Sequence, residues 1–156
     1  MNDQIIIMGI GNWLMSDDGV GVHAARLLAQ DPPDGVPVVD AGTDALSALS
    51  FLEEATRVLL IDAVRWGGAP GTIRRFTEGE LSSPPGRHTA HAVHLFGSRH
   101  LFRPDTEWPE FLILGVEPAS MTYGMELTPI VAAVLPQVIQ LSREIVTAWK
   151  SETVLT

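Results

Sequence analysis

Short apolar runs and amphipathic segments alternate along most of the chain. The apolar runs predict buried strands at residues 4–9, 36–39, 57–62 and 111–116, and a short edge strand at 72–76. Apolar residues at helical spacing predict helices at about 19–30, 46–52 and 88–101. Turn residues separate these elements at 31–35 and 67–71, and the polar stretch 77–87 is expected to be a loop.

The last helix has a clear start signal. Thr128 is a favoured N-cap residue, and Pro129 is favoured at the first helical position. Apolar residues continue at helical spacing as far as Trp149, and Pro136 is expected to kink or restart this helix. No long linker divides the sequence, so residues 1–156 are expected to form a single domain.

The alternation of strands and helices indicates an α/β fold. Neighbouring parallel strands need a crossover connection, usually a helix, and sheets built in this way are covered on both faces. We therefore expect three layers, with a twisted, mostly parallel sheet of about five strands flanked by helices. In such a sheet the ligand site lies at the carboxyl ends of the strands.

The composition narrows the range of functions. The 156 residues are 46% hydrophobic and 19% charged, which is typical of a globular protein. The net charge of −9 argues against nucleic-acid binding, which needs a basic face. The absence of cysteine excludes disulfides, thiolate catalysis and cysteine-rich zinc sites. Uninterrupted apolar segments are shorter than about 18 residues and the N-terminus lacks a basic region, so we expect a cytoplasmic protein without a membrane span or secretory signal.

The first predicted strand runs into a glycine turn, in the sequence IIIMGIGNWLMSDDGVG. Gly9 and Gly11 begin like a dinucleotide-binding fingerprint, but Leu14 stands where the third glycine belongs. Asp17 and Asp18 follow, and a carboxylate repels phosphate at the start of a helix. We therefore expect no nucleotide binding and interpret these acids as groups for metal contact or proton transfer. The competing interpretation is that one of them only caps the helix.

Three acids lie at or just after the ends of predicted strands: Asp18, Asp40 and Asp62. Because the carboxyl ends of parallel strands share one edge of a sheet, we expect these carboxylates to converge. Each has a structural alternative. Asp62 ends an apolar strand, where a buried carboxylate needs partners and backbone N–H groups would serve. For Asp40 the alternative is a turn closed by a hydrogen bond from its own side chain.

Three histidines follow at a spacing of three residues: His88, His91 and His94. On a helix they would spread over roughly 120°, so one imidazole with two carboxylates is easier to assemble than a three-histidine site. Such a mixed oxygen and nitrogen set suits nickel, zinc or iron. For each histidine, a solvated surface position is the competing interpretation. From the residues alone, the chain is interpreted as a metal-dependent hydrolase or a metal-recognising protein.

Several blocks, in order along nearly the whole chain, resemble the hydrogenase maturation endopeptidases. They are GIGNWLMSDDGVG at 9–21, DAGT at 40–43, LIDAV at 60–64, PGT at 70–72, GVEP at 115–118 and GMELTP at 124–129. Members of this family trim a C-terminal extension from the large-subunit precursor of nickel–iron hydrogenase. They act after nickel insertion and recognise the nickel in the substrate. The family fold, a twisted, mostly parallel sheet flanked by helices, agrees with the fold expected above.

The resemblance implies a set of site residues. It implies metal contacts by Asp18, Asp62 and His91, with catalysis by the two carboxylates, as in an aspartic-type endopeptidase. It also implies substrate binding by three residues of the DAGT block: Asp40, Gly42 and Thr43. The first metal position is often glutamate in the family, and Ala41 replaces a family glycine. Alternatives for the metal-contacting acid and imidazole are Asp17, His88 and His94.

The resemblance further implies that the protein holds no tightly bound cofactor, because the nickel is supplied by the substrate. The expected partner is the precursor of the hydrogenase large subunit, with no nucleic acid or membrane partner, and the expected oligomeric state is a monomer. Two other functions stay open from the sequence. One is a metal-dependent hydrolase acting on a small molecule, and the other is a non-catalytic chaperone that binds nickel or the precursor.

Overall fold

The computed structural model describes residues 4–82 and 90–155. Five strands form one sheet in the order β2-β1-β3-β5-β4. Four of them are parallel, β1 (Ile5–Ile10), β2 (Val38–Gly42), β3 (Arg57–Ala63) and β5 (Glu110–Val116), whereas β4 (Ile73–Thr77) pairs antiparallel with β5. The expected α/β class, with a mostly parallel sheet flanked by helices, is confirmed.

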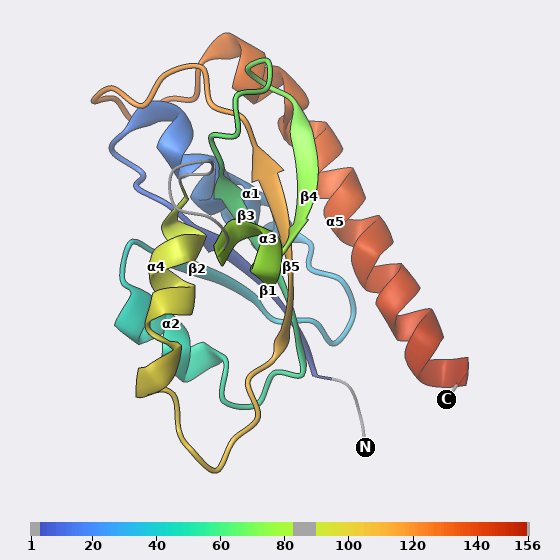
Figure 1. Cartoon of the computed structure of the whole chain (residues 1–156). Coiled ribbons are helices and arrows are strands. Elements are labelled where there is room, and N and C mark those ends of the chain that lie inside the picture. The colour runs from blue at the N-terminus through green and yellow to red at the C-terminus, as the bar shows by residue number, and fades with distance from the viewer. Residues whose placement is uncertain (1–3, 83–89, 156) are drawn as a thin grey trace.

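Helices cover both faces of the sheet (Figure 1). One face packs against α1 (Val20–Gln30) and the long C-terminal α5 (Pro129–Leu155). The other packs against α2 (Ala45–Phe51), the short α3 (Glu78–Ser82) and α4 (His91–Gly97). Two 3₁₀ turns complete the described chain, η1 (Ser16–Gly19) before α1 and η2 (Arg99–Leu101) after α4.

The central strands are apolar throughout because both of their faces are buried. All six residues of β1 are buried, and its side chains alternate between the two cores. Ile6 and Met8 pack on the α2–α4 side, whereas Ile5 and Ile7 pack on the α1–α5 side. Successive side chains of a strand point to opposite faces of the sheet, and both faces are buried here. The strand sequence is therefore apolar at every position, and this pattern predicted the strands.

Two predicted boundaries are wrong. The strand predicted at 36–39 is β2, Val38–Gly42, and it includes Asp40, which pairs with Gly9 of β1. The stretch 77–87 was expected to be a loop, but Glu78–Ser82 forms α3. Two reciprocal hydrogen bonds stabilise the start of this helix. The N–H of Glu80 donates to Thr77 Oγ1, and the N–H of Thr77 donates to Glu80 Oε1. This is a capping box, and a Thr-x-x-Glu signal was therefore present in the sequence.

The helix expected at 88–101 is shorter than predicted. Within the described residues it consists of α4, His91–Gly97, followed by η2. Ser98 ends α4, and its N–H donates to carbonyls of the last turn. His88 lies outside the described residues, as do residues 83–87 of the expected loop.

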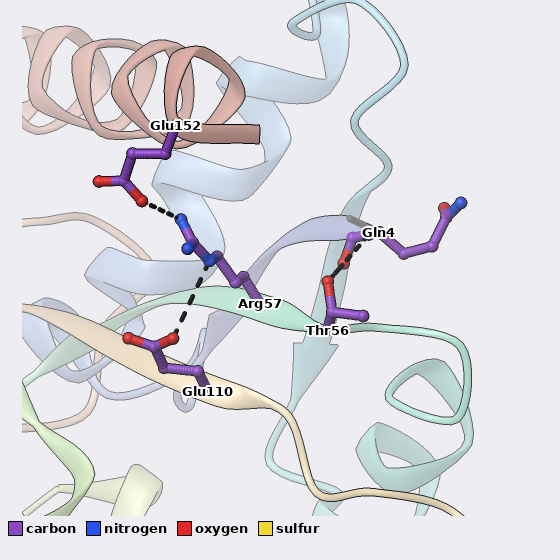
Figure 2. Close-up of polar contacts among 5 residues, drawn as sticks. All are labelled: Gln4, Thr56, Arg57, Glu110 and Glu152. Carbon is purple, nitrogen blue, oxygen red and sulfur yellow. Dashed lines mark hydrogen bonds and ion pairs between the residues drawn. The ribbon is translucent and has the colours of Figure 1, made fainter. Parts of the chain in front are cut away.

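The long α5 begins at Pro129 as predicted and continues through Pro136 without restarting. Near its end it is tied to the amino-terminal edge of the sheet (Figure 2). Nη1 of Arg57 lies 2.6 Å from Glu152 Oε2, and Nε of Arg57 lies 3.9 Å from Glu110 Oε2. Beside them, Gln4 N–H donates to Thr56 Oγ1 over 2.9 Å. These contacts lie at the opposite end of the strands from the residues expected to do chemistry.

Among the described residues, the stretch Pro129–Glu152 of α5 is long and apolar enough to cross a membrane by length and composition alone. The core helix of a globular protein passes the same test. Buried residues of α5, such as Val131, Val138 and Val146, pack into the core between the sheet and the helices α1 and α5. The helix is therefore weak evidence for a membrane segment.

Candidate active site

The carboxyl edge of the sheet brings Asp18 and His91 into contact. Asp18 lies in η1, directly after the loop that follows β1, and His91 is the first residue of α4. Oδ2 of Asp18 is 2.7 Å from Nε2 of His91, and the same oxygen accepts the N–H of Asn12 at 3.0 Å. The bond to Asp18 raises the pKa of His91, burial opposes this rise, and the nearby carboxylate of Asp62 adds to it. The pair therefore favours an imidazolium held by a carboxylate.

Asp62 is the buried acid of the site. It lies in β3 with no exposed surface, and its Oδ2 accepts the N–H of Ala92 at 2.9 Å. Its Oδ1 is buried and has no hydrogen-bond partner among the described residues. Burial raises the pKa of Asp62 to about 8, although the charge of His91 and the bond from Ala92 act against this rise. At neutral pH the group is thus mostly a carboxylic acid, with one oxygen left for a ligand or a proton.

Glycine allows the first loop to reach this position. Gly11 has a φ of +138°, and a Cβ there would lie 2.1 Å from the backbone oxygen of Asp18. Gly21 lets α1 approach the sheet, because a Cβ at that position would lie 2.1 Å from Ile61 O. These glycines bring the loop back over β1 and place Asp18 beside His91. Their role here is close backbone approach, which L side chains would prevent.

The adjacent acid, Asp17, faces a different part of the molecule. It is fully buried, and its carboxylate accepts four hydrogen bonds, from the N–H groups of Ala119, Ser120 and Thr128 and from the hydroxyl of Thr128. These bonds fasten η1 to the segment before α5. The N-cap interpretation is wrong for α1, because its N-cap is Gly19 and makes no side-chain bond. Asp17 is structural, because both of its carboxylate oxygens are bonded to residues of this segment.

The three residues of the DAGT block occupy two neighbouring hollows. Gly42 and Thr43 line a small pocket of about 60 Å³ together with His91. All three line an open hollow of about 410 Å³ on the α1 side of β2. The side chain of Asp40 accepts the N–H of Gly42 and pairs with Nε of Arg26, each at 3.1 Å. Asp40 thus makes the turn contact that was its structural alternative, while still lining the hollow.

The structure also separates the described histidines. His91 bonds Asp18, whereas His94 is exposed and lines the rim of the same small pocket. Among the described residues, no three His, Asp or Glu side chains converge closely enough to hold a metal ion. Asp18 and His91 bond each other, and Asp62 contributes one unpaired oxygen beside them. The donor chemistry of these three side chains suits a divalent ion.

Sequence reasoning missed the aromatic contact beside the site. The ring of Trp13 stacks on His23 at 4.0 Å between centroids, and the guanidinium of Arg26 lies 4.0 Å from the centroid of Trp13. His23 and Arg26 are one turn apart on α1, so their spacing was the available signal. Burial lowers the pKa of His23, which therefore presents a neutral ring to the indole.

Comparison with known proteins agrees with this architecture. A model of the hydrogenase maturation protease family (HycI) matches residues 22–145. The hydrogenase expression/formation protein HupD of Rhizobium leguminosarum bv. viciae is 29% identical over 94% of this chain and 75% of its own length. HoxM of Azotobacter vinelandii is 31% identical over 90% of this chain and 71% of its own.

Solved structures give the same result. The hydrogenase maturating endopeptidase HybD from E. coli superposes with a TM-score of 0.78 at 25% identity, over 96% of this chain and 93% of its own. HybD from Thermococcus kodakarensis gives a TM-score of 0.77 at 25% identity, over 91% and 98% of the two chains. The fold and site thus define a peptidase of α/β architecture. The chain belongs to the hydrogenase maturation protease family.

Proposed function

We propose that this protein removes the C-terminal extension from the nickel-loaded precursor of a nickel–iron hydrogenase large subunit. The observation that carries the proposal is the buried Asp62, with one unpaired oxygen, beside the Asp18–His91 pair. A carboxylic acid with a raised pKa, next to a carboxylate that forms an ion pair, suits proton transfer at neutral pH. Family membership gives the reaction class, peptide-bond hydrolysis during hydrogenase maturation.

The substrate's nickel is the proposed recognition element. Asp18, Asp62 and His91 supply two carboxylate oxygens and one imidazole, a set that suits a borderline divalent cation. Asp18 and His91 bond each other, and this bond holds two of the three donors close together. Asp18 and Asp62 are the proposed catalytic carboxylates, with Asp62 exchanging the proton because its acid form is the stable one near pH 7.

Three further residues are proposed to contact the peptide: Asp40, Gly42 and Thr43. Support comes from their place on two neighbouring hollows: Gly42 and Thr43 line the small pocket that His91 also lines, and all three residues line the larger hollow. The protein itself keeps no tightly bound cofactor in this proposal, because its three donors come from separate elements and include no thiolate. A monomeric, cytoplasmic protein that binds neither membrane nor nucleic acid accords with the net charge of −9.

The proposal is tested by incubating the protein separately with the nickel-loaded and the nickel-free precursor. The masses of the products are then measured by mass spectrometry. We expect release of a C-terminal peptide from the nickel-loaded form alone. Equal cleavage of both forms would overturn nickel recognition. Stable binding of the precursor without any released peptide would overturn catalysis and favour a chaperone.

A further inference from the structure

The strand β2 lies at one edge of the sheet and pairs, among the described residues, only with β1. The carbonyl of Pro37 accepts the N–H of Ile7 at 3.0 Å, so this residue turns its backbone toward β1. Backbone groups alternate along a parallel strand, and Val39 therefore also faces β1. The N–H and C=O groups of Val38 and Asp40 consequently face outward, in the geometry that accepts another strand.

Hollows flank this edge on both faces. On the α2 side, a hollow of about 310 Å³ is lined by Ile6, Val39 and Phe51, with Glu53 and Glu54 on its rim. On the α1 side lies the 410 Å³ hollow lined by Trp13, Val22, Arg26 and Asp40. An added strand would send successive side chains to opposite faces, and each face offers a recess to receive them.

The carboxyl end of β2 lies next to the candidate active site. β2 ends at Gly42, and Gly42 and Thr43 line the small pocket that contains His91. Within the described part of the chain, the other edge strand, β4, pairs only with β5, so β5 and β3 separate it from β1 and the loop that carries Asp18. A chain that runs along β2 toward its carboxyl end would arrive beside His91.

We propose that an extended segment of the precursor, next to the bond to be cleaved, binds by adding to the outer edge of β2 as a further strand. This inference rests on the proposed function and specifies how that site takes its substrate. Main-chain bonds to Val38 and Asp40 would hold the segment whatever its side chains, and the hollows would select among them. Of the two acids on the rim, Glu53 is ion-paired with Arg103 over 3.7 Å, and Glu54 favours a basic side chain on the α2 side.

The substitution Val38→Pro tests the main-chain contact. Val38 faces its N–H outward, so proline there removes a donor for the added strand and no bond of the native sheet. We expect the KM for the nickel-loaded precursor to rise by about tenfold with little change in kcat, since one hydrogen bond is lost and its acceptor is left unpaired. Val38→Ala shortens the same side chain and keeps the N–H, so its KM should stay within about twofold of the wild-type value. A KM for Val38→Pro equal to that of Val38→Ala would overturn the proposal.

Hydrogen–deuterium exchange gives an answer even if Val38→Pro does not fold. The wild-type protein is mixed with a saturating excess of the nickel-loaded precursor, and exchange before cleavage is followed by mass spectrometry in segments covering β2 and β4. We expect slower exchange in β2, where Val38 and Asp40 gain partners, and unchanged exchange in β4. Protection confined to β4, or none in β2, would overturn the proposal. If the wild-type protein meanwhile cleaves the precursor, only the mode of binding has failed and the proposed function stands.

Discussion

Asp18 and His91 are 73 residues apart in the chain, yet Oδ2 of Asp18 lies 2.7 Å from Nε2 of His91. The contact joins the loop after the first strand to the start of α4, across the carboxyl edge of the sheet. Both residues also interact electrostatically with the buried Asp62. The catalytic proposal depends on this group of three, so each member gives a separate test.

Asp18→Asn and His91→Ala should each lower the rate of precursor cleavage by about 100-fold or more, the usual range for loss of an acid–base group. Asparagine keeps the size of aspartate but loses the charge that binds a cation and holds the imidazolium. Cleavage is followed by mass spectrometry of the released peptide, with circular dichroism to check the fold. His94→Ala is the matched control and should cleave normally. An inactive His94→Ala beside an active His91→Ala would move the histidine role to the next turn of α4.

Asp17→Ala should destabilise the protein by about 3 kcal/mol, because four hydrogen bonds to a buried carboxylate are lost. Asp18→Ala removes the bonds to Asn12 and His91 at a more exposed position, and should cost much less. Urea unfolding of the two variants measures the difference. Equal losses at the two positions would contradict the division of the adjacent acids into a structural and a functional residue.

Stability should fall as the pH rises toward 8, and Asp62 should account for much of the fall. Its pKa of about 8 in the folded protein lies far above its ordinary value of 3.8, so the folded state holds a proton that the unfolded state releases. The unfolding free energy therefore decreases between about pH 4 and 8, by up to ~1.4 kcal/mol per pH unit. Asp62→Asn lacks this titration, so its stability relative to wild type should improve steadily from pH 5 to 8.

His91 adds to the same trend in the wild-type protein. Its folded pKa is raised, so its contribution is fully present below about pH 6.5 and is lost as the pH passes through the folded pKa. Asp62→Asn retains His91, so most of this contribution cancels between the two proteins. Urea unfolding at several pH values provides the measurement, and parallel profiles for the two proteins would contradict a raised pKa at Asp62.

The purified protein should retain no stoichiometric metal after dialysis against a chelator. Its donors come from η1, β3 and α4, and two of them bond each other. Elemental analysis by mass spectrometry is the measurement. One metal retained per chain would indicate a self-contained metallohydrolase, in which the ion belongs to the enzyme and not to its substrate.

Much of the fold was predictable because its signals are local. Buried strands such as β3 are continuous apolar runs in the sequence. Thr128 and Pro129 are residues favoured at a helix start, and they predict where α5 begins. The Thr77–Glu80 capping box was equally local, and α3 was missed because the surrounding composition resembles a loop. The extension of β2 through Asp40 depends on pairing with β1, which no local signal specifies.

The site was less predictable because its contacts are distant in the chain. Asp17 and Asp18 look alike in the sequence, and their roles differ because Asp17 meets residues 119–128 while Asp18 meets His91. Helical spacing alone left three histidines open, and the choice of His91 came from resemblance to a family. Asp62 was identifiable as an acid in an apolar strand, although its protonation depends on the burial that only the fold creates.

The most direct test of the account is precursor cleavage by Asp62→Asn. Asparagine can still accept the N–H of Ala92 through its carbonyl oxygen, so the fold should persist, with a melting temperature at or above that of wild type near pH 8. It carries neither the acidic proton nor the charge that a cation would require, so the account expects no detectable release of the C-terminal peptide from the nickel-loaded precursor. Near-normal release by a folded Asp62→Asn variant would contradict the catalytic role of Asp62.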